Sequence, residues 1–416
     1  MHPPRHLRIV LATVGSRGDV QPMLAVAQAL VARGHVPVIA APPNFGPWIR
    51  GLGFEFAELG VDIQALLAGN PSLMTGNPLR MFREIFRYFT EQPTLQVQQL
   101  RTICESADAM IYAGLAIFVA PSVCERLQLP GFGVMYTTCL LPSDQHPPAT
   151  IPWQGLPKWL NDLLWRLDRP FGNWLMRGTL NRMRKLLQLE PVPDIWDHLI
   201  GKQPPLLAVD ELLMPPDHRW QGRYPYANFL YFDDPLTLDP ELDAWLAEGA
   251  PPVFVGFGSM SGAGTARIGN LVIEAVKATG LRCVVGAGWA GLGEGVLPPN
   301  WRVVRDVPHT LLFPRTAVVV HHGGSGTTAQ ALRAGVPQVI LPLILDQFHH
   351  AHRMYVAGLA PRPVPMEKIT AIELTRAIRE ALVLPSNARQ ITAARLQSSN
   401  GREQVAQRLE EVFLDR

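Results

Sequence analysis

The stretch AVVVHHGGSGTTAQALRAGVP, residues 317–337, decides the fold of this chain. It opens with residues 317–320, a short apolar run with the length and composition of a buried strand. Residues 327–334 then show helical spacing, and a glycine and a proline end the helix. A second apolar run, residues 339–343, is typical of the next strand. Strand, glycine loop, helix and strand in this order predict one unit of a parallel α/β sheet.

The loop between the first strand and the helix, HHGGSGTT, has the composition of a phosphate-binding corner. The amino end of a helix presents backbone N–H groups and a partial positive charge, which suit an anion. Gly323, Gly324 and Gly326 would let a ligand approach the backbone closely, and His321 adds a donor. Glycines also occur at such corners for steric reasons alone, but this alternative leaves the paired histidines and the hydroxyls unexplained.

This loop resembles the donor-binding segment of the UDP-glycosyltransferase superfamily, and most closely its sterol, rhamnolipid and glycopeptide-antibiotic branch. Plant members carry a ribose-binding glutamate at the position of Ala329, which the sterol and antibiotic branch also lacks. The choice between a UDP-sugar and a dTDP-sugar as donor therefore stays open. The resemblance implies diphosphate contacts by His321, Gly323, Ser325, Gly326 and Thr327, and sugar contacts by Asp346 and Gln347.

Length and composition predict two domains with separate cores, since 416 residues exceed the size at which single cores stop growing. Hydrophobic residues make up 47% of the chain, which is enough for both cores. The formal net charge of +2 gives no electrostatic reason to expect a nucleic-acid partner.

The four cysteines are widely spaced and form no Cys-x-x-Cys pair, so we expect reduced thiols in a cytoplasmic protein. The first apolar run, residues 7–14, is too short for a signal core or a membrane-spanning helix. We expect it to be the first buried strand.

Both halves of the chain alternate short apolar runs with helical stretches, the pattern of a parallel sheet covered on both faces. The resemblance implies the GT-B fold, in which two Rossmann-like domains face each other across a cleft. Strands are expected at residues 9–13, 36–41, 109–113, 133–136, 253–257, 282–285, 303–304, 317–320 and 339–343, and the first helix at residues 22–33.

The expected domain boundaries follow from the same alternation. Residues 1–228 form an acceptor-binding domain, a proline-rich linker occupies residues 229–250, and residues 251–398 bind the nucleotide-sugar. In relatives the last helix crosses back onto the first domain, and residues 399–416 are expected to do the same.

The motif GSRGDVQP, residues 15–22, lies at the first strand-to-helix corner, where open α/β sheets bind ligands. Many superfamily members place a catalytic histidine at this corner, whereas the sterol and antibiotic branch has an aspartate. The resemblance therefore implies that Asp19 is the catalytic base. An aspartate shortly before Pro22 also favours a helix cap, so both roles stay open, and they can coexist.

The implied reaction moves a sugar, glucose or a deoxysugar, from a UDP-sugar or dTDP-sugar to an acceptor hydroxyl. A carboxylate within hydrogen-bond reach takes the hydroxyl proton as the new bond forms, and direct attack predicts inversion at the anomeric carbon. Many metal-dependent transferases hold a divalent cation with an Asp-x-Asp pair, which this sequence lacks. We therefore expect neither a metal nor another cofactor.

Two further donor contacts follow from the resemblance. The loop GFGSM, residues 256–260, resembles the family's other donor loop and places the Ser259 hydroxyl near the phosphates, although an ordinary turn fits it nearly as well. Residues 306–309 correspond to a segment that contacts the nucleobase through its backbone, which places Val307 near the base.

Residues 147–189 interleave tryptophans with lysines and arginines. This mixture fits an interfacial membrane helix, and equally the wall of an apolar acceptor pocket with a solvated outer face. The family usually forms its acceptor site here, which favours the pocket and a sterol, polyketide, phenolic or lipid acceptor. Peripheral membrane contact stays an open alternative. The pocket residues expected are Phe82, Phe86, His146 and Trp153, with core packing as the alternative for the phenylalanines and a surface loop for the histidine.

Two other functions fit the same scaffold. A nucleotide-sugar epimerase would need no acceptor pocket and would form its product from the donor alone. A non-catalytic nucleotide-sugar-binding auxiliary protein would need neither a base nor an acceptor. The joint presence of Asp19, His321, Asp346 and Gln347 favours the transferase.

Overall fold

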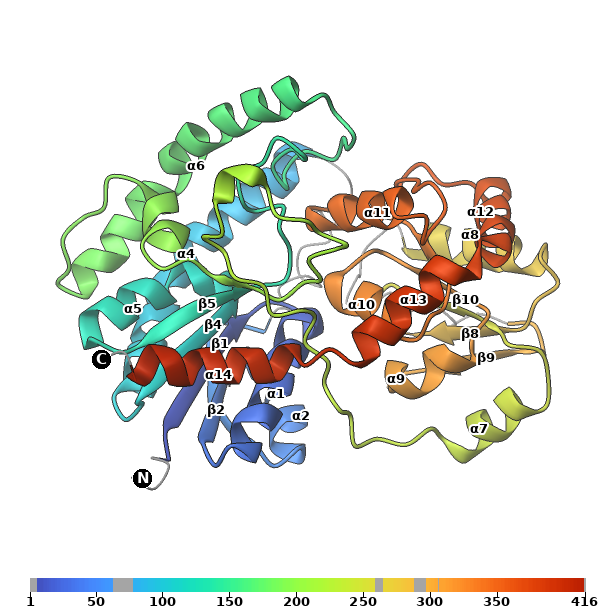
Figure 1. The fold of residues 1–416 in the computed structure, drawn as a ribbon, viewed down its shortest axis with the longest axis horizontal. Coiled ribbons are helices and arrows are strands. Elements are labelled where there is room, and N and C mark those ends of the chain that lie inside the picture. The colour runs from blue at the N-terminus through green and yellow to red at the C-terminus, as the bar shows by residue number, and fades with distance from the viewer. Residues whose placement is uncertain (1–5, 63–77, 259–264, 288–296, 306, 415–416) are drawn as a thin grey trace.

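Two parallel β-sheets with helices packed on them form the two halves of the molecule (Figure 1). The first sheet has the strand order β3-β2-β1-β4-β5-β6, and the second has the order β11-β10-β7-β8-β9. Neighbouring strands run parallel throughout, which confirms the expected pair of α/β domains. The computed structural model describes residues 6–62, 78–258, 265–287, 297–305 and 307–414, without the side chains of residues 78–90, 265–267 and 414.

Strands and helices alternate along the chain because parallel neighbours need a crossover connection. The strands are β1 (Arg8–Val14), β2 (Val36–Ala41), β3 (Glu55–Glu58), β4 (Ala109–Gly114), β5 (Gly131–Met135), β6 (Leu206–Leu207), β7 (Val253–Val255), β8 (Cys283–Gly286), β9 (Trp301–Val304), β10 (Val318–His321) and β11 (Gln338–Ile340). The α-helices are α1 (Arg17–Ala32), α2 (Gly46–Gly51), α4 (Pro78–Cys104), α5 (Ala120–Leu127), α6 (Lys158–Leu186), α7 (Pro240–Ala247), α8 (Thr265–Lys277), α9 (His309–Leu312), α10 (Ser325–Arg333), α11 (Asp346–Val356), α12 (Ala371–Val383), α13 (Ser386–Gln397) and α14 (Gly401–Leu414).

The apolar runs located the central strands to within a few residues, but two edge strands were not expected. Strand β3 is exposed or half-buried along its length, and β6 has only two residues. Neither therefore produces the continuous apolar run by which a doubly covered strand is identified.

The first helix begins five residues earlier than expected, at Arg17 instead of residue 22. Ser16 is its N-cap: the Ser16 hydroxyl accepts from the N–H of Gly18, and Asp19 accepts from the N–H of Ser16 at 2.7 Å. This reciprocal capping box starts the helix, and Pro22 lies inside it.

Alternate side chains of β1 enter different cores, as the two-residue period of a strand requires. Val10 and Ala12 belong to a buried cluster on one face of the sheet. Ile9 and Leu11 pack on the other face, in the cluster that includes α1 and the buried Leu409 of α14. Helix α14 thus lies against α1, on the first domain, as Figure 1 shows.

The two domains touch through buried apolar side chains. The cluster that contains Val10 and Ala12 also includes Ala329 and Leu332 of α10 and Met354 of α11. Within the linker expected at residues 229–250, α7 packs on the second domain, where Trp245 shares a cluster with Phe254. The connection between the domains is therefore shorter than the composition indicated.

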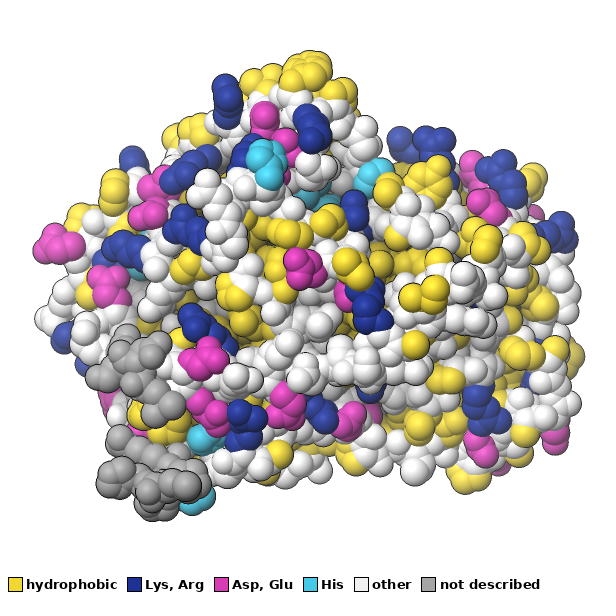
Figure 2. Space-filling model, in the orientation of Figure 1, with side chains coloured by type: hydrophobic (Ala, Val, Ile, Leu, Met, Phe, Trp, Pro, Cys, Tyr) yellow, Lys and Arg dark blue, Asp and Glu magenta, His cyan; other side chains and the backbone are white. Residues whose placement is uncertain are grey.

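Helix α6 turns most of its tryptophans to solvent, and apolar side chains gather along this outer edge of the molecule in Figure 2. Trp153 before the helix is 67% exposed, and Trp159 and Trp174 are 66% and 76% exposed, whereas Trp165 is buried. Trp153, expected in the acceptor pocket, is thus largely exposed in this structure, and its place in the pocket stays a prediction. The surroundings of the exposed tryptophans in the fold are those of an outer surface.

The four cysteines, Cys104, Cys124, Cys139 and Cys283, are all buried and unpaired as disulfides, as expected for reduced thiols. Across the described ranges, none of the helices combines the length and the apolar character that crossing a bilayer requires.

Candidate active site

The amino end of α10 is open to a ligand. Gly324 is the N-cap residue and has no side chain with which to accept from the first turn. The backbone N–H groups of Ser325, Gly326 and Thr327 therefore lack the intrahelical partners that later residues have. A Cβ added at Gly326 would meet no atom within 4 Å, so the space beside this residue is open. Such an end favours an anion.

The two histidines of the loop have different surroundings. His321 is fully buried. Its Nδ1 accepts from the N–H of Gly323 at 3.1 Å, so the ring proton is on Nε2, which donates to Oε1 of Gln338 at 2.8 Å. Burial lowers the pKa of His321 to about 3, so the ring is neutral. Both nitrogens are occupied by protein groups, and His321 has no free donor for a phosphate in this arrangement.

His322 lies between the two glycine loops of the second domain. A Cβ on Gly258 would approach its Cε1 to 3.3 Å, and a Cβ on Gly324 would approach its Nε2 to 2.7 Å, so both glycines make room for the ring. Its buried Nδ1 has no hydrogen-bond partner in the described part of the chain. Of the histidine pair, His322 is the one with a polar atom left for a ligand.

Helix α11 closes the loop from the other side. Nδ1 of His350 donates to the carbonyl oxygen of Gly323 at 2.9 Å. Gly323 has φ of +93°, and a Cβ there would come within 2.8 Å of Cγ2 of Ile340, so only glycine fits. Asp346, the first residue of α11, lies 3.8 Å from Nδ1 of His350. Asp346 and the glycine loop, residues 321–328, are thereby held together.

Gln347 holds the turn from which Asp346 projects. Its Oε1 accepts from the N–H groups of Leu343 at 2.9 Å and Ile344 at 3.2 Å. The next residue, Leu345, has φ of +49°, a conformation that is costly for leucine and that persists only where the surroundings impose it. The side-chain oxygen Oε1 of Gln347 therefore fixes the turn. The expected contact with the sugar would then be made by the side-chain nitrogen Nε2.

The carboxylate of Asp19 lies in the first turn of α1, close enough to Asp346 of the second domain for that charge to raise its pKa. Oδ2 accepts from the N–H of Ser16 at 2.7 Å and from its hydroxyl at 3.1 Å. A Cβ at Gly15 would overlap this carboxylate, and a Cβ at Gly114 would lie 3.0 Å from Oδ1. The backbone at both glycines therefore packs closely around the carboxylate. Asp19 therefore has the cap role, one of the two that the sequence left open, and the role of base stays a prediction.

The pKa of Asp19 is raised to about 6. Burial is the largest cause, the two hydrogen bonds from Ser16 oppose it, and the negative charge of Asp346 raises it further. Desolvation thus outweighs the cap, contrary to the modest basicity that capping alone favours. A carboxylate with this pKa is ionised at neutral pH and is a stronger base than an exposed aspartate.

One contact beside Asp19 lies within the first domain, and two others link the first domain to the second. The Tyr136 hydroxyl donates to the backbone oxygen of Asp19 at 3.3 Å. Oγ1 of Thr138, two residues further on, lies 3.1 Å from Nε2 of His349 in α11. The pKa of His309 in the second domain is lowered mainly by burial and, to a smaller extent, by the positive charge of Arg17 in the first domain. The gap is therefore narrow and lined from both sides.

His146 lies at this interdomain contact and not on the surface, contrary to the surface-loop alternative. It is 6% exposed, and its ring centroid lies 4.7 Å from that of His349. Nε1 of Trp165 donates to the backbone oxygen of His146 at 2.9 Å, so the buried side of α6 positions the loop that contains His146. Nε2 of His146 is buried without a partner among the described atoms. His146 is thus buried at the contact between the domains, and its place in the acceptor pocket stays a prediction.

The remaining expected site residues are placed only in part. Ser259 lies outside the described residues, and so do the side chains of Phe82 and Phe86 in α4. Val307 is half-buried and packs against the core cluster of the second domain. A nucleobase contact at Val307 would therefore use its backbone, as the family pattern implies.

One group in the described ranges has the side-chain composition of a metal site: Asp144, Asp217 and His218. Asp217 already accepts from Ser143 Oγ at 2.8 Å and from Nε of Arg219 at 3.0 Å. These hydrogen bonds hold the pKa of Asp217 far below its usual range, against the effect of burial. The carboxylate is thus satisfied by Arg219, and the group is an ion-pair network.

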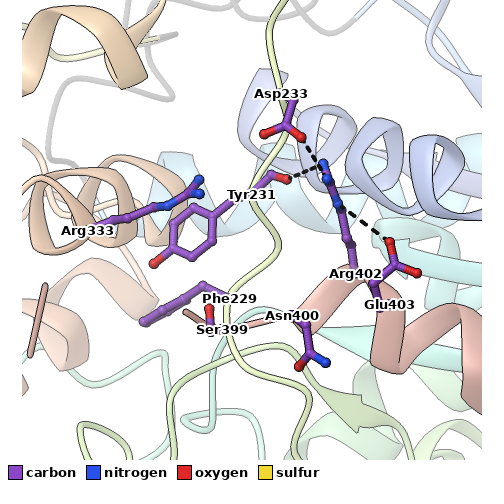
Figure 3. A pocket seen from close by; sticks show the side chains of 9 residues that line it. Phe229, Tyr231, Asp233, Arg333, Ser399, Asn400, Arg402 and Glu403 are labelled. Atoms are coloured by element: carbon purple, nitrogen blue, oxygen red, sulfur yellow. Dashed lines mark hydrogen bonds and ion pairs between the residues drawn. The ribbon is translucent and has the colours of Figure 1, made fainter. Parts of the chain in front are cut away.

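A hollow of about 180 Å³ lies where the chain crosses between the domains, between the linker and the start of α14 (Figure 3). Arg402 pairs with Asp233 at 2.6 Å and donates to the backbone oxygen of Tyr231 at 3.3 Å. A Cβ at Gly401 would overlap the carbonyl oxygen of Ala227. These contacts join the linker to the start of α14. The hollow therefore lies between the two segments that connect the domains.

The sequence did not single out His322, Tyr136, Thr138 or His349. The doubled histidines at 321–322 and 349–350 were visible, but spacing alone does not tell which ring of a pair is buried. Tyr136 and Thr138 follow an expected strand without any motif of their own. The contact between Thr138 and His349 appears only when the two domains come together.

Comparison with known proteins agrees with this geometry. Residues 9–138 match the family model described as glycosyltransferase family 28 N-terminal domain, and residues 288–412 match the one described as erythromycin biosynthesis protein CIII-like, C-terminal domain. The sterol 3-beta-glucosyltransferase UGT80B1 of Arabidopsis thaliana is 32% identical over 394 residues, covering 90% of this chain and 62% of that protein. The chain thus spans less than two thirds of this relative.

Two further matches cover both partners almost completely. The vancomycin aglycone glucosyltransferase of Amycolatopsis orientalis is 30% identical over 405 residues, 93% of each chain. The crystal structure of the glycosyltransferase VinC in complex with dTDP has a TM-score of 0.69 at 21% identity, over 99% of this chain and 100% of that one. The structural match extends through both domains.

Proposed function

The chain belongs to the UDP-glycosyltransferase superfamily, in the branch of the sterol and glycopeptide-antibiotic enzymes, and is a glycosyltransferase; from this premise we propose that it moves a sugar from a UDP-sugar or dTDP-sugar to a hydroxyl of a hydrophobic small molecule. One observation carries the proposal. The carboxylate of Asp19 lies close enough to Asp346 of the other domain for that charge to raise its pKa, and Asp346 lies beside His350, which donates to Gly323 of the glycine loop.

The donor diphosphate is proposed to lie against the amino end of α10. The free N–H groups there supply fixed dipoles that stabilise charge on the departing diphosphate. The side-chain donor is assigned to His322 in place of His321, because His322 keeps an unpartnered nitrogen and His321 does not. Thr327 and Ser325 extend the first turn toward the same space.

The sugar is proposed to lie between Asp346 and Asp19. Asp346 and the amide nitrogen of Gln347 would hold its hydroxyls, and the two relatives named as glucosyltransferases favour glucose. The nucleobase would lie near the backbone of Val307. The dTDP complex of a similar fold and the superfamily's use of UDP-sugars support the two donor classes.

Asp19 is the proposed base. The acceptor hydroxyl gives its proton to the carboxylate as its oxygen attacks the anomeric carbon, and the bond to the diphosphate breaks. A single displacement of this kind inverts the anomeric centre. A base with a pKa near 6 is matched to work at neutral pH. The reaction is proposed to need no metal ion, since the donor site supplies helix dipoles and an imidazole for the leaving group.

The acceptor is proposed to be a sterol, polyketide, phenolic or lipid alcohol, bound on the first-domain side of the gap near His146. Names of relatives that act on a sterol and on a vancomycin aglycone support this range. The experiment is incubation of the protein with UDP-glucose or dTDP-glucose and cholesterol or a simple phenol, with the glycoside detected by mass spectrometry. The anomeric proton coupling of the product in NMR reports inversion.

The same experiment separates the two other candidates. An altered sugar formed from the donor alone would favour the epimerase. Nucleotide binding without any turnover, across both donors and a panel of acceptors, would favour a non-catalytic binder. A thermal-shift screen with UDP, dTDP, GDP and ADP comes first, because a ligand held only by the folded state raises its stability.

A further inference from the structure

Helix α6 carries an apolar stripe on its outer face that the fold leaves uncovered. Trp159, Leu163, Leu167 and Trp174 are 66%, 45%, 59% and 76% exposed. Their spacing of four, four and seven residues brings them to one side of the helix. Phe171, 47% exposed, has its ring 6.0 Å from that of Trp174 and continues the same side. We call these five side chains the outer stripe.

The outer stripe is accompanied by positive charge. The exposed charged residues of α6 are all basic, and the two acidic residues of the helix, Asp162 and Asp168, are half-buried. Asp162 is paired with Arg219. Figure 2 shows lysine and arginine side chains beside the apolar ones along this edge. Among the exposed basic residues, Lys158 pairs with Asp144 at 3.7 Å and Arg169 with Asp194 at 2.5 Å. The others are Arg166, Arg177, Arg182 and Lys185.

The opposite face of α6 is anchored, so the exposure of the stripe is not a consequence of a loosely attached helix. Trp165, Leu180 and Met183 are buried in the first domain. A Cβ at Gly172 would come within 2.8 Å of the Trp196 ring, which shows how closely the helix packs. Arg184 is 2% exposed and pairs with Glu125 at 2.8 Å.

We propose that the outer stripe of α6 docks on the surface of an anionic lipid bilayer. Tryptophan, phenylalanine and leucine on one face of a helix enter the boundary between headgroups and acyl chains, and neighbouring lysines and arginines are attracted to anionic headgroups. Charge complementarity selects this occupant: an exposed face with only basic charged residues repels an identical face on a second copy of the chain.

The docked helix would lie close to the interdomain gap. The segment before α6 reaches α11 of the second domain, since a Cβ at Gly155 would come within 3.3 Å of Cε1 of His352. On the other side, Trp165 of α6 holds the His146 loop. Docking therefore orients the acceptor side of the protein toward the bilayer. The interaction itself does not depend on the proposed transfer reaction.

The test is co-sedimentation of the purified chain with vesicles of phosphatidylcholine, with and without phosphatidylglycerol. We expect association with the anionic vesicles that weakens as salt is raised. The triple variant W159Q/L167Q/W174Q should lose at least tenfold in bound fraction, and R166E/K185E should lose the preference for anionic vesicles. A matched control, I372Q/V383Q in α12, removes apolar side chains that are 82% and 80% exposed and should bind like the wild type.

Melting temperatures of all variants should match that of the wild type, because every substituted side chain is exposed. Absence of binding to anionic vesicles, or equal binding by the triple variant, would overturn the proposal. So would a dimer in sedimentation velocity that the triple variant dissociates, with no vesicle binding, because the stripe would then join two copies of the chain.

Discussion

The negative charge of Asp346, at the start of α11, raises the pKa of Asp19, in the first turn of α1 of the other domain. The proposed base and the proposed sugar-binding carboxylate therefore sense each other across the gap between the domains. Burial does most to raise the pKa of Asp19, and Ser16 opposes it with two hydrogen bonds. The basicity of Asp19 is thus a property of the assembled molecule.

Replacing Asp19 with asparagine should remove the base and preserve the site. The amide oxygen can still accept from the N–H of Ser16, so the helix cap survives in part. Loss of general-base catalysis typically costs on the order of 10²- to 10⁴-fold in rate. We expect a loss of this size in kcat, with UDP or dTDP affinity within a factor of about two of the wild type by calorimetry. Wild-type turnover in Asp19→Asn would remove Asp19 from the mechanism.

The same substitution should stabilise the fold at alkaline pH. The folded-state pKa of Asp19, about 6, lies above its ordinary value of 3.8. Folded protein therefore holds this proton more tightly, and the associated stability is present below pH 4 and lost as pH rises through 6. The ionised group costs at most about 3 kcal/mol at pH 8. Thermal melts at pH 8 and pH 4 should show Asp19→Asn more stable than the wild type only at the higher pH.

The pH dependence of kcat/KM should show an acid limb near pH 6, because protonated Asp19 cannot accept the hydroxyl proton. Ser16→Ala removes a hydrogen bond that lowers the pKa of Asp19, so its limb should move to higher pH. Asp346→Asn removes a charge that raises this pKa, so its limb should move to lower pH. Shifts of the two variants in the same direction would contradict the electrostatic account.

The two histidines of the loop should differ in what they affect. His321→Ala leaves Gln338 and the N–H of Gly323 without a buried partner, which costs about 1–3 kcal/mol of stability. His322→Ala removes a packed ring whose Nδ1 has no partner, so it should lower the melting temperature less than His321→Ala does and weaken binding of UDP or dTDP more. Calorimetric titration beside thermal melts separates the two effects. If both variants lost the same nucleotide affinity and the same stability, the two histidines would not have the different roles assigned to them.

Two glycines of the same loop offer a matched pair. A Cβ at Gly323 would press on Ile340 in a conformation with positive φ, so Gly323→Ala should destabilise the fold. A Cβ at Gly326 would enter open space, so Gly326→Ala should fold normally and obstruct only the ligand. We expect a lowered melting temperature for the first variant and wild-type stability with weaker nucleotide binding for the second. Unchanged nucleotide affinity in Gly326→Ala would argue against a phosphate at this helix end.

Metal removal should leave the transfer reaction unchanged. The leaving diphosphate is proposed to be stabilised by the amino end of α10 and by His322, and neither depends on a divalent cation. Turnover in excess EDTA should equal turnover in magnesium. A loss in EDTA that manganese restores would show that a cation takes part.

Local sequence was sufficient for the central strands, for the glycine loop, and for the positions of Asp19 and Asp346 after strands, but not for the edge strands β3 and β6. Residues 317–337 contain a strand, a turn and a helix in succession, and each of these signals depends on neighbours within a few positions. The run GSRGDVQP likewise located Asp19 at the end of a strand. The start of α1 was wrong by five residues because the Ser16–Asp19 capping box was not recognised, although both residues were visible.

Only the tertiary structure decided the chemistry of individual side chains. It showed that His321 is occupied by Gln338 and that His322 is not, that His146 is buried against His349, and that Trp159 and Trp174 face solvent. The raised pKa of Asp19 has the same origin. Desolvation, partner choice and exposure depend on which distant segments pack together, and a linear pattern does not contain those distances.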